Sequence, residues 1–318
     1  DVYKRQTHQQ YAWEKFILSG DIGYQNNHRE EWSAFHTHYG TQPLPETDPD
    51  KELAFNLNTF SFSAKGRWIG SSSWEHRMGW DSQFQRNTIS GYSFLLPEYD
   101  RFTTGISWLT TYRPDNTLSV SGGVRYDYGR MRVFAHDDPY LATYLQEQGY
   151  DEEQVEFYRW NSRRVNRSFG DYSLSLGVVW TPSMRHQLKV NVGRSFRLPG
   201  ANELASNGVH HGTFRHEQGD VTLSSEQGWQ MDASYQLKYG RWSVYVSPFV
   251  NWFSNYIFLR PTGEWSVLPH TGLIYRYTQT EALFAGAEAS VELTVLPTLN
   301  YRISGEYAVS YTHLTLPT

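Results

Sequence analysis

The chain has 318 residues, a formal net charge of −5 and a mean hydropathy of −0.62. It contains no cysteine, which excludes a disulfide scaffold, a cysteine-ligated zinc site and a cysteine nucleophile. The small net charge and the lack of Lys/Arg runs argue against nucleic-acid binding. The sequence has no run near the ~18 consecutive apolar residues that a membrane helix requires. Its 16% aromatic content and 25 glycines fit strands with one face in lipid, and also fit a secreted β-sandwich.

Both ends of the chain resemble translated sequencing adapters. Residues 1–6 read DVYKRQ, and residues 309–318 read VSYTHLTLPT. We exclude both segments from the fold prediction, as for any cloning scar. We therefore expect residues 7–308 to be an internal, metagenomic fragment of a longer protein. Raw reads without adapter sequence at these junctions would contradict this expectation.

Apolar and polar residues alternate strictly in several segments. Residues 118–128, for example, place Leu118, Val120 and Val124 on one face and Ser119 and Arg125 on the other. A period of two predicts half-buried strands. We expect roughly 11 strands, each long enough to cross a bilayer at a tilt. Their expected ranges are 15–34, 52–67, 71–87, 102–112, 117–132, 170–181, 187–197, 226–239, 241–258, 273–296 and 299–308.

The connections between these strands alternate between short and long. Short turns rich in Pro, Asn and Gly are expected at 113–116, 181–183, 239–240 and 297–299, and long polar loops at 36–50, 88–101, 135–168, 199–225 and 259–271. Trp180 lies just before the turn at 181–183 and Trp242 just after the turn at 239–240, positions where a membrane interface favours aromatic rings. The opposite faces of the strands are polar, so they cannot form the second packed core of a sandwich. The pattern predicts an all-β, antiparallel transmembrane barrel with short periplasmic turns and long extracellular loops.

The longest loop carries its own helical signals. Asp138-Pro139 precedes an apolar i, i+4 stripe, and Asp151 precedes a second short stripe, so we predict one or two short helices. These helices could cover a ligand or pack on neighbouring loops. The acidic run 151–153 fits a helix start rather than the carboxylate pair of a glycosidase.

Three segments together resemble the β-barrel of TonB-dependent outer-membrane receptors, over essentially all of residues 7–308. One is GGVRYD, which contains Arg125 and Asp127, and another is a Gly-x-Glu strand start at Gly286 and Glu288. The third is a strand ending in Phe-Arg-x-Pro, followed by a loop that leads to Glu at the next strand. Its matching residues are Phe196, Arg197, Pro199, Glu203, Leu204, Gly208, His210, Glu217, Gly219, Asp220, Leu223 and Glu226.

The resemblance implies a specific function. Such barrels have about 22 strands and a plugged lumen, so this chain would form about half of one, without the plug, the energy-coupling box and the closing strand. The family takes up scarce, bulky ligands such as ferric siderophores, haem or cobalamin. Its expected partners are outer-membrane lipid, the ligand and, through the plug, the TonB complex. We expect no catalytic step, no resident cofactor and no structural metal.

Two other classes of protein stay open at this stage. One is a secreted, soluble all-β protein that binds or hydrolyses carbohydrate, and the other is a passive porin. Membrane fractionation separates the first of these from a receptor, and an upstream plug-coding segment separates the second.

The ligand-contact candidates are loop residues. One set, in the loop after residue 199, is His210, His211, Arg215 and His216, and a weaker set is His36 and His38. Imidazole is a common metal ligand but needs convergent partners, so these residues could equally be ordinary polar loop groups. His210 also belongs to the motif, which favours a structural role. For Arg197 and Glu203 we expect lumen or loop-base pairing rather than ligand contact. Alternation places Arg194 on the lipid face, which requires a bulge or snorkelling.

Overall fold

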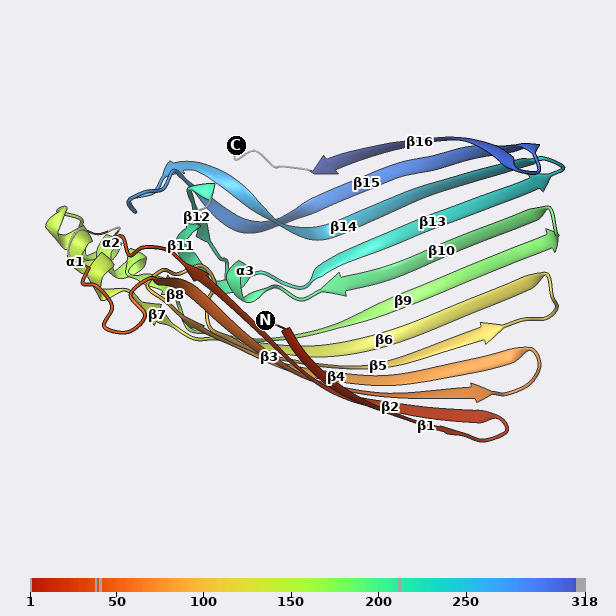
Figure 1. The fold of residues 1–318 in the computed structure, drawn as a ribbon, viewed down its shortest axis with the longest axis horizontal. Helices are drawn as coiled ribbons and strands as arrows, with labels where there is room; N and C mark the ends of the chain where they lie inside the picture. Colours follow the sequence, from red (N-terminus) through yellow and green to blue (C-terminus); the bar gives the residue numbers. More distant parts are fainter. Residues whose placement is uncertain (1, 38, 40–41, 211–212, 313–318) are drawn as a thin grey trace.

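The computed structural model describes residues 2–37, 39, 42–210 and 213–312 (Figure 1). Its dominant element is one sheet, which has 14 strands within this described part. The twelve long strands are β1 (Val2–Ala12), β2 (Phe16–Trp32), β3 (Lys51–Ile69), β4 (Trp74–Ser90), β5 (Tyr99–Tyr112), β6 (Leu118–Val133), β9 (Val165–Ser183), β10 (His186–Arg197), β13 (Glu226–Tyr239), β14 (Trp242–Trp265), β15 (Leu273–Leu296) and β16 (Leu299–Thr312).

The long strands pair antiparallel with their neighbours in chain order, and the sheet curves like part of a barrel wall (Figure 1). The short turns all lie at one end, which we call the turn end, and the helices and long loops lie at the other, the loop end. The predicted antiparallel all-β wall is therefore confirmed. No helix in the described ranges is long and apolar enough to cross a membrane.

Strand positions agree closely with the prediction. The ranges 226–239 and 273–296 match β13 and β15 residue for residue. Two differences lie at the chain ends: the whole of β1 (Val2–Ala12) was not predicted, and β16 continues beyond residue 308 to Thr312. Within the two segments excluded from the fold prediction, residues 2–6 pair in register with β2 and residues 309–312 pair in register with β15. Their origin as adapter sequence stays a prediction.

The outward face of the wall is apolar and exposed. One row across four strands pairs Trp80 with Ile106, Ile106 with Tyr126, and Tyr126 with Tyr172. These four side chains are 45–69% exposed. Soluble monomers rarely present contiguous apolar surface of this kind, whereas strands that face lipid require it.

The loop end is a packed assembly of several loops. It contains β7 (His136–Asp137), α1 (Pro139–Glu147), α2 (Glu152–Tyr158) and β8 (Trp160–Ser162). The two helices start as predicted, since Asp138 accepts hydrogen bonds from the first turn of α1 and Asp151 forms a capping box. Their apolar sides join residues of two other loops in one cluster, so the helices pack on neighbouring loops. Its buried members are Leu141, Ala142, Leu145, Val155, Val209 and Leu268.

The loop after β10 folds onto the inner face of the sheet. It forms α3 (Ala201–Ala205) and a hairpin of β11 (Asn207–His210) and β12 (Arg215–Gln218), and β12 pairs parallel with β15. Leu204 of α3 lies in a buried cluster with Met131 and Val133 of β6 and Phe169 of β9. By alternation these three strand residues share the face of Arg125. The prediction of a polar inner face throughout is wrong here, because α3 covers the strands and excludes water.

Candidate functional site

The base of the loop after β10 is an ion-pair network around Arg197. This side chain, at the last residue of β10, lies 2.9 Å from a carboxylate oxygen of Glu203 and 3.2 Å from one of Glu226. Glu203 also accepts a 2.7 Å hydrogen bond from the amide of Gly200 and so caps α3. Glu226, buried at the start of β13, accepts another from the amide of Ile257. Of the two kinds of pairing expected for Arg197, in the lumen or at the loop base, the ion pairs lie at the loop base.

Other motif residues fix the same base by packing. Pro199 and Leu204 are buried, and Gly219 passes so close to α3 that a Cβ there would lie 2.5 Å from the amide nitrogen of Ala205. Gly208 passes similarly close to Phe94, with 3.1 Å left for a Cβ. Gly219 therefore allows a backbone contact that a larger residue would prevent, and Gly208 allows close packing of the Phe94 ring.

Three further motif positions lie on strands of the wall and one on the hairpin strand β12. Phe196 is half-buried and pairs with Gln227. Glu217 accepts a hydrogen bond from the hydroxyl of Tyr277. Gly286 leaves room for the ring of Phe249 of β14, whereas Glu288, two residues further along β15, is exposed.

His216 is the centre of a buried polar network between three loops. Its Nε2 lies 2.9 Å from Oδ1 of Asn207, whose Nδ2 donates to the carbonyls of Phe157 and Trp160. Because the amide oxygen of Asn207 must then accept, Nε2 carries the proton, and Nδ1 accepts from the hydroxyl of Ser266 at 2.8 Å. Burial lowers the pKa of His216 to about 4. This imidazole is neutral at pH 7, and both its nitrogens are bonded to protein.

The other predicted contact residues are more accessible. Arg215 is exposed and stacks over Tyr275 at 5.0 Å, and His210 shares a hydrogen bond with the hydroxyl of Thr213. His36 is exposed and lies against Tyr92 at another part of the loop end. His38 and His211 lie outside the described residues. Among the residues that are described, no three His, Asp or Glu side chains converge as a metal site would require.

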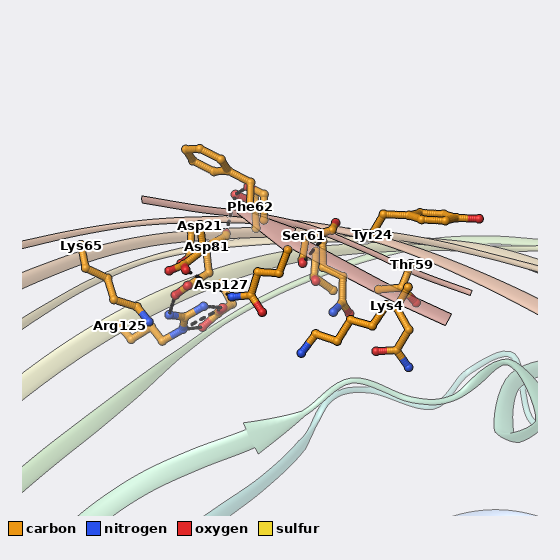
Figure 2. Close-up of a pocket in the computed structure, with 18 residues that line it drawn as sticks. Lys4, Asp21, Tyr24, Thr59, Ser61, Phe62, Lys65, Asp81, Arg125 and Asp127 are labelled. Carbon is orange, nitrogen blue, oxygen red and sulfur yellow. Dashed lines mark hydrogen bonds and ion pairs between the residues drawn. The ribbon is translucent and has the colours of Figure 1, made fainter. Parts of the chain in front are cut away.

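The inner face nearer the turn end is polar and hollowed. Figure 2 shows charged side chains projecting from several strands to one side of the wall, while Phe62 points to the other. Arg125 bridges Asp127 of its own strand at 2.6 Å and Asp81 of β4 at 2.8 Å. The groove that these residues line has a volume of about 500 Å³. A polar wall of this kind suits a water-filled or plugged lumen.

Arg194, which alternation places on the lipid face, is buried. Antiparallel pairing of β10 with β9 ends at this residue, opposite Leu174. Its guanidinium lies 4.0 Å from the ring centre of Tyr172 and 2.8 Å from the carboxylate of Asp171. The charge is thus neutralised by an ion pair beside the point where the two strands separate.

Three features now define the class of protein: a curved antiparallel wall, an apolar outward face, and long loops that fold inward at one end. They describe the wall of an outer-membrane-type β-barrel. The chain belongs to the TonB-dependent receptors, since residues 2–316 match the family described as TonB dependent receptor-like, beta-barrel. This membership favours a receptor over a passive porin or a soluble carbohydrate-active protein.

Solved structures of similar fold support the assignment. The copper transporter OprC is 14% identical with a TM-score of 0.67, and the match covers 98% of this chain and 46% of that one. The hemophore receptor HasR of Serratia marcescens, solved as a double mutant with HasA and heme, is 17% identical with a TM-score of 0.67, covering 97% and 48%. The FrpB iron transporter of Neisseria meningitidis, F3-3 variant, is 13% identical with a TM-score of 0.61, covering 93% and 41%. The chain thus spans about half the length of these proteins.

Proposed function

We propose that this chain supplies about half the barrel wall of an outer-membrane receptor. The complete receptor takes up a scarce, bulky ligand, such as a ferric siderophore, haem or cobalamin, with energy delivered through TonB. The observation that carries this proposal is the combination of a lipid-facing wall with a loop assembly folded over the inner face. A passive pore needs an open mouth, whereas a receptor needs a structured one that binds its ligand.

The similar structures support the choice of ligand class. They include a copper transporter, a hemophore receptor, an iron transporter and a ferric yersiniabactin uptake receptor from Yersinia pestis. Metals and metal chelates recur among them, so we assign this receptor to the same broad class. The receptor lies in the outer membrane of a Gram-negative bacterium and has no catalytic step.

Within the loop end, exposed and half-buried side chains carry the proposed ligand contacts. Arg215 and His210 pair with each other across the β11–β12 hairpin and are accessible, and His36 is a second candidate. His38 and His211 are also proposed as ligand contacts, on the basis of the sequence alone. We do not propose His216 as a ligand contact, because both its ring nitrogens are hydrogen-bonded to protein groups.

Uptake by the full-length protein tests the function. We expect a strain that lacks its own receptors to accumulate a labelled ferric chelate or haem when this protein is expressed, and to lose that uptake when TonB is deleted. Uptake that persists without TonB would show a passive pore, and a protein found in the soluble fraction would contradict the membrane assignment.

The ligand contacts need a separate measurement. We expect the Arg215→Gln and His210→Gln variants to raise the concentration for half-maximal uptake by about tenfold, since each removes a polar contact. Arg185→Gln, in a turn at the opposite end, serves as the matched control. Equal uptake curves for all three variants would place the ligand elsewhere.

A further inference from the structure

The outward face changes its chemistry abruptly near the loop end. A row of aromatic rings crosses four strands, because Tyr24 pairs with Phe60, Phe60 with Phe84, and Phe84 with Phe102. The next outward row towards the loop end is polar throughout. It consists of Asn26, Asn58, Arg86, Asp100, Arg132 and Asn166, which are joined in register from β2 to β9.

The aromatic row marks the upper edge of an apolar belt. At the turn end the belt starts with another aromatic pair, Trp74 and Tyr112, at a ring distance of 4.4 Å. Along β4, Trp74 and Phe84 are ten positions apart, which corresponds to about 25 Å for a strand tilted by about 40°. This is the height of the apolar band of an outer-membrane barrel. The polar row therefore lies at the level of the lipid headgroups.

Three arginines gather at this level, and we call Arg86, Arg130 and Arg132 the arginine patch. All three are exposed, and Arg130 lies on the same outward face, two residues below Arg132. Arg86 and Arg132 both lean on one ring, with guanidinium carbons 5.9 and 5.1 Å from the centre of Phe134. The patch thus presents two guanidinium groups close to one ring, and a third from Arg130, one outward position nearer the turn end.

The charge of the patch is only partly compensated. Arg86 lies 3.8 Å from Glu98 and 3.9 Å from Asp100, both beyond hydrogen-bond distance. In the described part of the chain, Arg130 and Arg132 form no ion pair, and Arg130 donates to the amide oxygen of Asn166. Three positive and two negative charges leave this exposed patch basic.

We propose that the arginine patch binds the phosphate groups of a phosphorylated glycolipid in the outer leaflet. The inference rests on the proposed function, because it requires the wall to sit in an outer membrane with the loop end outside. Guanidinium groups match phosphate geometry through paired hydrogen bonds, and each cation near an anionic lipid surface strengthens binding. The acyl chains of the same lipid lie against Phe84 and Phe102, directly below.

Native mass spectrometry of the full-length protein in detergent tests this site, with diphosphorylated lipid A and its dephosphorylated form as probes. We expect the triple variant R86Q/R130Q/R132Q to bind diphosphorylated lipid A about tenfold or more weakly. The control R113Q/R185Q/R241Q removes the same charge at the turn end and should bind as the unchanged protein does. The variant R86K/R130K/R132K keeps the charge but loses the paired guanidinium donors, so its affinity should lie between those of the triple variant and the unchanged protein.

Several results would overturn the proposal. The first is equal binding of lipid A by the triple variant and the unchanged protein, and the second is that the triple variant loses affinity for the dephosphorylated lipid by the same factor. The third is displacement of lipid A by millimolar inorganic phosphate alone. The fourth is a dimer of this chain that dissociates when the arginines are replaced. Heat-modifiable gel migration shows whether each variant is folded. If the full-length protein is absent from the outer membrane, the proposed function fails. If it is present there but the arginines have no effect, only this inference fails.

Discussion

The inner face of β6 differs sharply between its two halves. Arg125 and Asp127, nearer the turn end, line an open polar groove, whereas Met131 and Val133, six residues further on, lie in a dry apolar cluster. All four occupy alternate positions of one strand and point to the same side. What differs is the cover, because α3 lies over the second pair. Burial on this face is decided by a loop from elsewhere in the chain.

Polar groups in the two regions differ in the same way. The Arg125 side chain is 32% exposed and keeps its charge beside two carboxylates. His216 at the loop end is fully buried and satisfied as a neutral imidazole. Water tolerates imperfect pairing near the turn end, but each polar group under the loops needs a partner. Substitutions at the loop end should therefore cost more than those in the open wall.

Leu204→Asp should have the largest effect. It places a carboxylate in the cluster that joins α3 to β6 and β9, at a cost of about 4 kcal/mol. The loop should detach while the strands persist, so hydrogen exchange should accelerate in residues 199–225 but not in β6 near Arg125. Val221→Asp, at an exposed position of the same loop, is the control. Equal exchange in both variants would show that α3 does not cover the wall.

Acidification should loosen the loop end through His216. The folded pKa of about 4 lies below the ordinary value of 6.5, so the unfolded loop binds the proton first. The network is fully stabilising above pH 6.5 and loses stability as the pH falls towards 4, by about 3 kcal/mol in total.

Hydrogen exchange of the Asn207 and His216 amides as a function of pH measures this loss. The difference from His216→Gln, which cannot titrate, isolates the imidazole from other groups. A variant with the same pH dependence as the unchanged protein would show that His216 is not the responsible group.

Much of the wall was predictable, because strand periodicity is a local property. β13 and β15 match their predicted ranges, and the pairing of Arg197 with the loop base follows from motif positions. The prediction for β14 ended at residue 258, yet the strand continues to Trp265, because its last part pairs with the start of β15. Its extension depends on a partner that alternation within β14 does not reveal.

The loop end was less predictable, because its contacts join distant segments. His216 looks like any loop histidine until Ser266, 50 residues later, is placed beside it. The hairpin strands β11 and β12 have four residues each, too few for a periodic signal, and β12 is held by a parallel pairing with β15. The apolar residues Met131 and Val133 were a usable signal, since they interrupt the polar side of β6.

Arg197→Gln should have an intermediate effect. It leaves Glu203 and the buried Glu226 without their cation, but the Arg197 side chain is 44% exposed, so solvent screens part of the loss. We expect the loop to lose about 2 kcal/mol of stability, measured as faster hydrogen exchange of the α3 amides. Arg215→Gln, on the same loop, is the matched control, because Arg215 forms no ion pair among the described residues, and it should cost under about 0.5 kcal/mol.

Alanine at two glycines compares the regions most directly, and apart from the control variants Gly105→Ala should have the smallest effect. At Gly105, in the open wall, a Cβ would overlap the ends of the Asp127 and Arg125 side chains, which can move aside, for about 1 kcal/mol or less. At Gly219 it would meet the backbone of Leu204 and Ala205, which cannot move, so Gly219→Ala should cost about 2 kcal/mol. The melting temperature of each variant, followed by heat-modifiable migration, measures the stability of the wall. Hydrogen exchange in residues 199–225 measures the stability of the loop. If Gly105→Ala proves the more damaging, the wall around Arg125 is as tightly packed as the loop base, and the contrast between the two regions does not hold.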